Sequence, residues 1–169
     1  MVLDVDGFRE AMRLRAAGVS VVTTRDRQEE PRGFTATAVC SVSLVPPLIL
    51  VCIDRTAECY EAFQEAETFA VNLLRDVQEP LSRYFAQKAA RKFVDIPHRA
   101  GITGSPILTD VLAHVECRVQ ARYPGGDHTI LLGEAVGSGA ASVDDAASPL
   151  LYFRGGYARL TSPPPADVL

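Results

Sequence analysis

The chain has 169 residues, 47% hydrophobic and 22% charged, which is enough for one globular domain with its own core. Seventeen basic residues against 21 acidic ones give a net charge of −4, so no basic field favours a nucleic-acid backbone or an anionic membrane. The longest apolar run, residues 48–53, is too short to span a bilayer, and the acidic N-terminus lacks the basic start of a secretory signal. We therefore expect a cytoplasmic protein that binds neither nucleic acid nor membrane.

The cysteines and histidines predict no metal site. The four cysteines, Cys40, Cys52, Cys59 and Cys117, have neither metal-ligand nor redox spacing, and three lie in or near apolar runs. We expect them to be reduced and mostly buried. The three histidines, at positions 98, 114 and 128, are far apart in the sequence and share no short motif.

The first third of the chain predicts one helix and three strands. Residues 6–17 have the apolar spacing of an amphipathic helix, which Gly18 ends, and residues 19–24 are β-branched almost throughout, as in strands. Two more strand-like runs, 34–44 and 48–53, meet at two prolines that cannot donate to a sheet.

These last two runs differ in character. The first is small and hydroxyl-rich, so its backbone is approachable from one side, and the second is apolar on both faces, which predicts a buried central strand. The two runs are consistent with an ordinary β-hairpin whose hydroxyl side chains lie on a solvent-exposed face. They also fit a support for a planar cofactor.

A short helix is expected after this hairpin. Tyr60 and Phe63 have helical spacing and predict a helix that begins near Thr56. Because a helix N-terminus carries unpaired N–H groups, an anion could bind there beside Arg55 and Thr56. The alternative is an ordinary N-cap next to a solvated arginine.

A basic cluster follows the next two elements. Residues 69–74 predict a strand, and Pro80 opens a helix that runs toward Lys88, Arg91 and Lys92. Such a cluster is usually a solvated face, but it is also how one phosphate would be held.

The second half of the chain predicts a long hairpin. After a Gly- and Pro-rich loop at 97–106, strict alternation over 111–122 predicts a half-exposed antiparallel strand. The turn at 123–128 returns the chain into residues 129–136. Asp127 and His128 in that turn could brace it or take part in chemistry.

The whole pattern predicts a mainly β fold, a closed or nearly closed antiparallel barrel with a few short helices. A last strand pair, 150–153 and 157–160, completes it, and the tail 161–169 has three consecutive prolines and is expected to be disordered. There is no parallel βαβ unit, no G-x-G-x-x-G and no Walker loop, so a Rossmann-type nucleotide site is not expected.

Four segments carry a resemblance to a known family. They are Gly33-Phe-Thr-Ala with Ser41-Val-Ser-Leu-Val-Pro-Pro-Leu-Ile-Leu-Val-Cys, then Phe69-Ala-Val-Asn-Leu-Leu, then Lys92-Phe, and finally Gly126-Asp-His with Ile130-Leu-Leu-Gly-Glu. In order and spacing they resemble the short-chain flavin reductases, the FMN-binding split-barrel enzymes that supply reduced flavin to two-component monooxygenases. Arg55-Thr-Ala and Arg122-Tyr-Pro look most like the reductases of actinobacterial aromatic polyketide pathways.

The resemblance implies a fold and an activity. The fold would be an antiparallel Greek-key split β-barrel over residues 1–160. The activity would be that of an NAD(P)H-dependent flavin reductase, in which NADH or NADPH reduces FMN, FAD or riboflavin by hydride transfer. The protein would be a homodimer with its flavin sites at the subunit interface, and a flavin-dependent monooxygenase would receive the reduced flavin.

The resemblance also implies the site. The flavin ring would lie against residues 35–40 and 52–54, with its phosphate near residues 55–59, and His128 would be the catalytic residue that meets the nicotinamide. The implied cofactor-binding residues are Thr35, Ala36, Thr37, Ala38, Val39, Cys40, Cys52, Ile53, Asp54, Arg55, Thr56, Cys59, Lys92, Phe93 and Tyr152.

Several positions depart from the family pattern. Relatives commonly carry Ser or Asn and then Ser at Thr37 and Ala38, an aromatic residue at Val39, a hydroxyl residue at Cys59, and Asp at Arg91. The hydroxyls missing at Ala38 and Cys59 could each have made a hydrogen bond to flavin, worth about 0.5–1.5 kcal/mol when formed. Arg91 could offset the loss or shift the preference among flavins. Two alternatives therefore stay open: a non-catalytic flavin carrier, and a split-barrel enzyme that uses another substrate or a deazaflavin.

Overall fold

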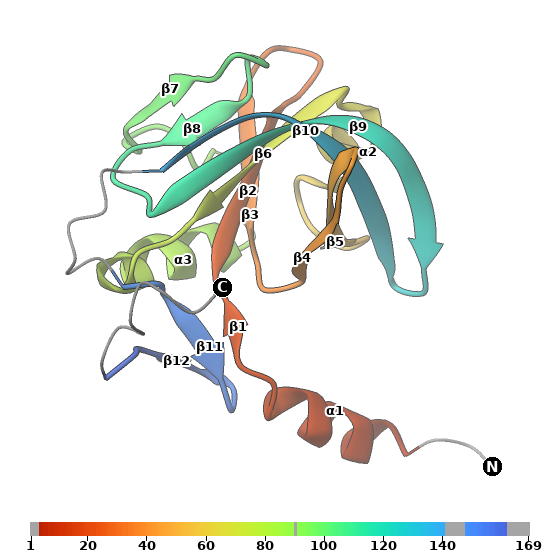
Figure 1. Ribbon diagram of the computed structural model, residues 1–169, viewed down its shortest axis with the longest axis vertical. Coiled ribbons are helices and arrows are strands. Elements are labelled where there is room, and N and C mark those ends of the chain that lie inside the picture. The colour runs from red at the N-terminus through yellow and green to blue at the C-terminus, as the bar shows by residue number, and fades with distance from the viewer. Residues whose placement is uncertain (1–3, 90, 141–147, 162–169) are drawn as a thin grey trace.

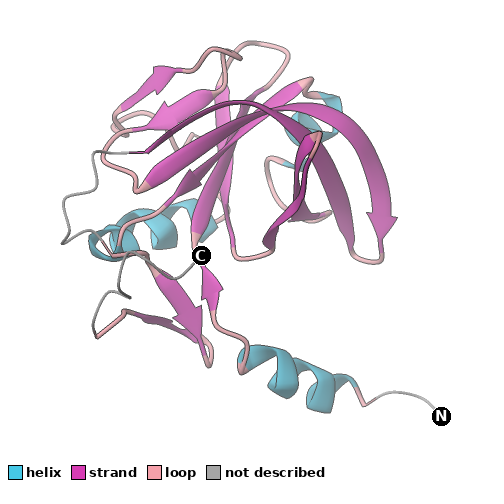
Figure 2. Ribbon diagram, in the orientation of Figure 1, coloured by secondary structure: helices cyan, strands magenta, loops and turns pink. Residues whose placement is uncertain are grey.

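A strongly curved antiparallel sheet makes up most of the molecule in the computed structural model (Figure 1), which describes residues 4–89, 91–140 and 148–161. Figure 2 shows how few helices accompany the strands. The prediction of a mainly β, antiparallel fold with a few short helices is confirmed. None of the helices in the described ranges is long and apolar enough to cross a membrane.

Seven strands form the large sheet and two small sheets lie at its margins. The large sheet contains β2 (Ser20–Arg25), β3 (Pro31–Ala36), β4 (Val39–Leu44), β5 (Pro47–Asp54), β6 (Thr68–Leu73), β9 (Ala113–Gly125) and β10 (His128–Ala140). The small sheets are β1 (Ala17–Gly18) with β11 (Leu151–Phe153) and β12 (Gly156–Ala158), and β7 (His98–Ala100) with β8 (Pro106–Leu108). The helices are α1 (Val5–Arg13), α2 (Tyr60–Glu65), the 3₁₀ helix η1 (Asp76–Gln78) and α3 (Glu79–Ala86).

The connection between β3 and β4 closes the sheet into a barrel. The strand order is β3-β2-β6-β9-β10-β5-β4, so β3 and β4 are the two edges. Only Thr37 and Ala38 join them, and three Cα steps span at most about 11 Å. The sheet must therefore curl until its edges meet at this end, where the Cys52 N–H donates to the Ala38 carbonyl at 3.1 Å.

The barrel encloses one core and α3 covers a second. Phe63, Phe69 and Leu131 are fully buried inside the barrel, while Phe85 of α3 packs with Leu150 and its neighbours outside it. The two clusters hold the strands and α3 in fixed relation, since close-packed interiors resist displacement.

The prediction that residues 48–53 form a buried central strand is wrong. β5 lies next to the edge strand β4, and only Val51 and Ile53 within it are buried. The turn before it projects from the barrel, with Leu44 and Val45 exposed by 89% and 92%. Within the run itself Leu48, Ile49 and Leu50 are only partly buried, so it is not a continuous core segment.

Three element boundaries also differ from the sequence prediction. α1 ends at Arg13 rather than residue 17, because Ala17 and Gly18 pair with β11. The expected strand 34–44 breaks at residues 37–38, where the chain crosses between the sheet edges. The expected loop 97–106 contains the ladder β7–β8. Of the tail 161–169, residues 162–169 lie outside the described residues.

A glycine in the Ile130-Leu-Leu-Gly-Glu segment allows a close approach of β10 to the core. A Cβ at Gly133 would lie 2.5 Å from the Phe69 ring and 2.8 Å from the Cys117 Cβ. Both neighbours are fully buried. A larger residue there must displace the packed core.

We expect Gly133→Ala to lower the free energy of unfolding by about 1–3 kcal/mol, the usual cost of overpacking a core. Urea denaturation measures it. Gly18→Ala is the matched control, because a Cβ at Gly18 meets no atom within 4 Å. Equal midpoints for the two variants would contradict the packing argument.

A buried carboxylate ties the 101–103 turn to β9. Glu116 is buried, and its Oε2 accepts the N–H and the hydroxyl of Thr103, each at 2.9 Å. Burial by itself raises the pKa of Glu116, but the hydrogen bonds from Thr103 and Ile102 and the nearby His114 outweigh burial and lower this pKa below its ordinary value.

The lowered pKa predicts a pH-dependent contribution to stability. It is fully present above the unfolded-state pKa of about 4.3 and is lost as the pH falls through the lower folded-state pKa. We expect Glu116→Gln to reduce the unfolding free energy by about 1–3 kcal/mol at pH 7, with the difference from wild type shrinking below about pH 4. Urea melts from pH 3 to 7 test this, with Glu10→Gln on the exposed α1 as control. A difference that does not change with pH would contradict it.

Candidate active site

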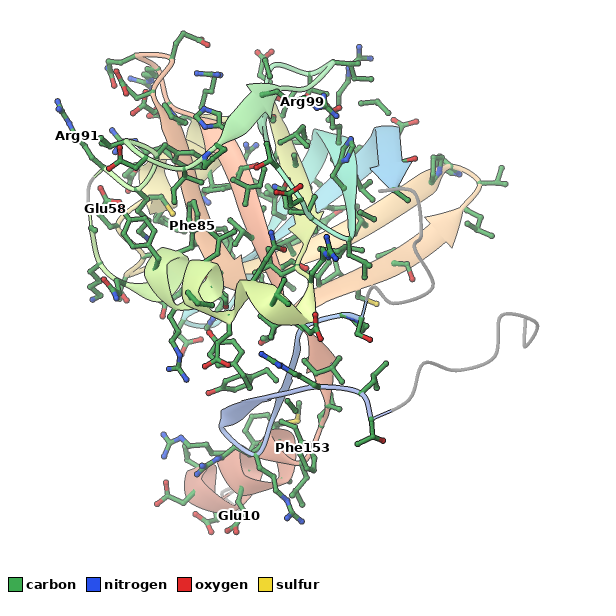
Figure 3. All side chains as sticks on the ribbon, turned by 90° about the vertical axis from the view of Figure 1, so that its left-hand side faces the viewer. Glu10, Glu58, Phe85, Arg91, Arg99 and Phe153 are labelled. Atoms are coloured by element: carbon green, nitrogen blue, oxygen red, sulfur yellow. The ribbon has the colours of Figure 1, made fainter. Side chains whose placement is uncertain are left out.

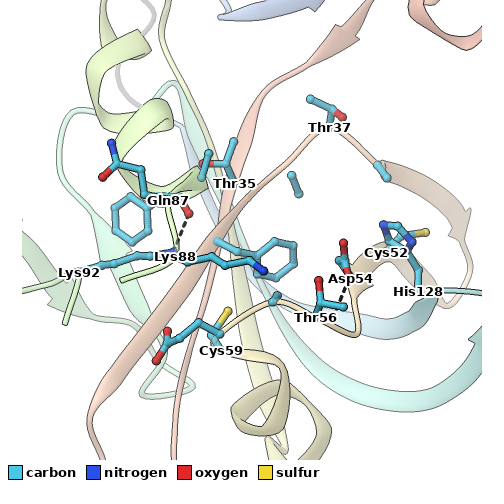
Figure 4. A pocket seen from close by; sticks show the side chains of 17 residues that line it. Thr35, Thr37, Cys52, Asp54, Thr56, Cys59, Gln87, Lys88, Lys92 and His128 are labelled. Carbon is cyan, nitrogen blue, oxygen red and sulfur yellow. Dashed lines mark hydrogen bonds between the residues drawn. The ribbon is translucent and has the colours of Figure 1, made fainter. Parts of the chain in front are cut away.

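A pocket of about 300 Å³ opens where the barrel closes (Figure 4). It lies among the end of β3, the 37–38 connection, the end of β5, the start of β10 and the segment after α3. The lining residues are Phe34, Thr35, Ala36, Thr37, Ala38, Cys52, Asp54, Thr56, Ala57, Glu58, Cys59, Phe85, Ala86, Gln87, Lys88, Lys92 and His128.

The barrel wall of the pocket is largely backbone and small side chains. Residues 37 and 38 lie outside both flanking strands, so their N–H groups are not committed to a ladder. The Thr35 hydroxyl, in contrast, donates to the Ser82 carbonyl of α3 at 2.6 Å. A ligand on this wall therefore finds the amides of the connection and the Thr37 hydroxyl as donors.

The turn after β5 forms the next wall and differs from the expected helix start. The Asp54 Oδ1 accepts the Thr56 N–H at 2.7 Å, and α2 begins only at Tyr60. Thr56 is therefore not a helix N-cap, and the prediction of a helix that begins near Thr56 is wrong. The hydrogen bonds from the Thr56 backbone and hydroxyl, aided by the charges of His128 and Lys88, lower the pKa of Asp54.

His128 stands at the mouth of the pocket, at the start of β10. Gly126, with φ of 73°, makes the turn that places His128. Across the sheet, the Cα partner of His128 is Asp54. The His128 side chain is 40% exposed, and its Nδ1–H donates to the Asp127 carboxylate at 2.6 Å. This bond fixes the ring and leaves Nε2 for a ligand.

The opposite wall is held by a buried lysine. Lys92 is 6% exposed, and its Nζ donates to the carbonyls of Phe85 at 2.8 Å and Gly33 at 3.4 Å, so it ties the end of α3 to β3. Burial lowers the pKa of Lys92. Burial also raises the pKa of the neighbouring Cys59 to about 11, so that thiol is protonated at neutral pH.

The structure brings most of the predicted site residues together and leaves some outside. Thr35, Ala36, Thr37, Ala38, Cys52, Asp54, Thr56, Cys59, Lys92 and His128 line the pocket; Val39, Cys40, Ile53, Arg55, Phe93 and Tyr152 do not. Ile53 points into the core between Cys52 and Asp54, as strand alternation requires. Phe93 packs on Phe85, with ring centroids 5.1 Å apart.

Tyr152 lies near the site but in a neighbouring cleft. That cleft is bordered by α1 and β11, and it shares Thr37 with the pocket. Thr37 is thus the wall between the two.

Sequence reasoning missed the contribution of α3 and its following segment. The lining residues not predicted are Phe34, Ala57, Glu58, Phe85, Ala86, Gln87 and Lys88. Strand alternation could have indicated that Ile53 points inward, but no local pattern reveals that α3 packs beside β3. Lys88 was visible only as one member of the basic cluster.

Together, these elements form an antiparallel barrel with an open pocket at its closing seam. The chain belongs to the flavin reductase like domain family, whose model matches residues 12–161. This confirms the family resemblance found in the sequence.

Three similar proteins agree with the family. The flavin reductase (NADH) of Kitasatospora aureofaciens is 43% identical over 160 residues, which are 94% of this chain and 83% of that protein. The actinorhodin polyketide dimerase of Streptomyces coelicolor is 41% identical over 162 residues, covering 96% and 90%. The solved Streptomyces globisporus C-1027 NADH:FAD oxidoreductase SgcE6, in complex with NAD and FAD fragments, matches with a TM-score of 0.85, 34% identity and 99% of both chains.

We expect Thr35→Val to lower the free energy of unfolding by about 1 kcal/mol, because the Ser82 carbonyl loses a donor. Thr37→Val is the matched control. Among the described residues the Thr37 hydroxyl has no recorded hydrogen bond, so its removal should change stability by less than about 0.5 kcal/mol. Equal losses in thermal melts would contradict the assignment.

Proposed function

We propose that the protein is an NAD(P)H-dependent flavin reductase that reduces FMN or FAD and hands the reduced flavin to a partner monooxygenase. The observation that carries the proposal is the pocket at the barrel closure, with uncommitted amides on one wall and His128 at its mouth, in a chain of the flavin reductase family. NADH is the expected donor, since the flavin reductase of Kitasatospora aureofaciens carries NADH in its name and SgcE6 is an NADH:FAD oxidoreductase.

Hydride transfer from nicotinamide to flavin is chemistry that the two bound molecules supply. The task of the protein is to position them and to stabilise the charge that develops. The backbone donors at residues 37–38 suit the carbonyl and nitrogen edge of an isoalloxazine. The strand end at Cys52 and Asp54 gives the ring a firm edge, because β5 is paired on both sides.

The turn at residues 54–59 is the proposed place for the flavin phosphate. Thr56 lines it, and Cys59 offers a protonated thiol rather than an anion. Lys92 was expected to bind the phosphate. Because its ammonium group already holds two carbonyls, we assign it to shaping the wall.

His128 is the proposed contact of the nicotinamide. Its ring is fixed by Asp127 and stands at the pocket mouth, where a second flat molecule would approach a ring lying on the barrel wall. Neither atom of the reacting pair needs a proton from His128, so its role is orientation.

Two properties of this protein are further parts of the proposal. The first is a homodimer: α1 contains no buried residue, and its Phe8 and Met12 are exposed together with Leu44 and Val45 of the β4–β5 tip. Figures 1 and 3 show α1 and the β11–β12 hairpin standing away from the barrel. Pairing of two chains would cover these apolar surfaces. The second is a cytoplasmic location, which suits reduced cysteines and a nicotinamide donor.

Oxidation of NADH or NADPH in the presence of flavin is the direct test of the activity. NADH or NADPH consumption is followed at saturating FMN, FAD or riboflavin. We expect oxidation of NADH with at least one flavin. If flavin binds but neither nucleotide is oxidised with any flavin, the non-catalytic carrier is the better account.

We expect His128→Ala to raise the KM for NADH about tenfold, because one positioning hydrogen bond is lost, and to change the KM for flavin much less. Steady-state kinetics with each substrate varied in turn measure both. His114→Ala, on β9 far along the hairpin from His128, is the control. An unchanged KM for NADH would remove the role assigned to His128.

A further inference from the structure

A flavin phosphate in the pocket would require a basic side chain to balance its charge. Five basic residues lie in or near the segments that form the pocket. They are Arg32, Arg55, Lys88, Arg91 and Lys92. A flavin 5′-phosphate is a dianion, and lysine and arginine side chains are its usual partners in proteins. Their contacts decide which of them can serve.

Two of the five are committed to other partners. Lys92 holds the carbonyls of Phe85 and Gly33 from a buried position. Arg32 pairs with Asp26 at 2.8 Å and lies 3.9 Å from Glu58. Moving either toward a ligand would break contacts that hold the fold.

Two others do not line the pocket. Arg55 is absent from the pocket lining, although its backbone N–H fixes the turn through the Asp127 carbonyl. Arg91 lines a separate depression with Phe93 and Val94, and Figure 3 shows it at the outer edge of the molecule.

Among the described residues, Lys88 both lines the pocket and has a side chain that is not engaged elsewhere. It lines the pocket, and in the part of the chain that the structure describes, no recorded hydrogen bond or ion pair engages its ammonium group. Figure 4 shows its side chain crossing the pocket with its end toward Thr56 and Asp54. Its charge contributes to the lowered pKa of Asp54, which places its field on the 54–56 turn.

We propose that Lys88 binds the phosphate of a flavin nucleotide against the 54–56 turn and thereby makes the pocket select FMN and FAD over riboflavin. This inference rests on the proposed function for its ligand. Lys88 follows the end of α3 and is exposed, so its flexible side chain can close over a bound nucleotide. The residue positions the nucleotide and takes no part in hydride transfer.

FMN and riboflavin test the proposal sharply, because they share a ring and differ by the phosphate. We expect Lys88→Met to raise the ratio of the KM for FMN to the KM for riboflavin about tenfold, the effect of one lost charged hydrogen bond. Lys88→Arg should restore most of the preference. Arg91→Met, three residues away, is the control and should leave the ratio as in wild type.

A binding titration makes the test independent of turnover. FMN and riboflavin are titrated by fluorescence without nicotinamide, at low and high salt. The affinity of wild type for FMN should fall with salt, and Lys88→Met should lose most of that dependence. An unchanged FMN-to-riboflavin ratio in Lys88→Met, or an equal loss for both flavins, would overturn the proposal. Failure of wild type to oxidise NADH would count against the proposed function, while the titration would still decide the role of Lys88.

Discussion

The two-residue connection between β3 and β4 is the constraint on which the site depends. It joins the opposite edges of a seven-stranded sheet, so the sheet has to close where Thr37 and Ala38 cross. Closure brings the end of β5 and the start of β10 to the same seam, with the Cys52 N–H bonded to the Ala38 carbonyl. Within the described residues, the backbone N–H groups of Thr37 and Ala38 donate no hydrogen bond to another backbone group, and we propose that the flavin ring uses them.

Packing from outside the barrel keeps this seam in shape. The Thr35 hydroxyl bonds the Ser82 carbonyl, and Lys92 bonds the carbonyls of Phe85 and Gly33, so α3 is tied to β3 at two places. The Thr35 hydroxyl and the Lys92 ammonium group, which make these contacts, belong to residues that the family resemblance assigned to cofactor binding. Donors held in this way preserve the pocket before any ligand arrives, which lowers the cost of ordering it on binding.

The sequence predicted the strands better than the site. Alternation over residues 111–122 predicted β9, because a period-two pattern is typical of a strand with one exposed face. The β-branched run before residue 25 predicted β2 through strand propensity, and five of its six residues are buried. The burial of residues 48–53 was misjudged, because Leu48, Ile49 and Leu50 are apolar and yet only partly buried. The role of the α3 segment was also invisible, because Lys88 and Phe85 reach the pocket only through long-range packing. The family resemblance supplied the segments around Thr35, Cys52 and His128, which local patterns alone left open.

A crystal structure of the protein with FMN bound tests the central claim most directly. The account predicts the isoalloxazine along the 37–38 connection and the end of β5, in hydrogen-bond reach of the backbone amides, with His128 beside its open face. A ring bound in the cleft between α1 and β11, or a seam filled by side chains while FMN binds elsewhere, would contradict it.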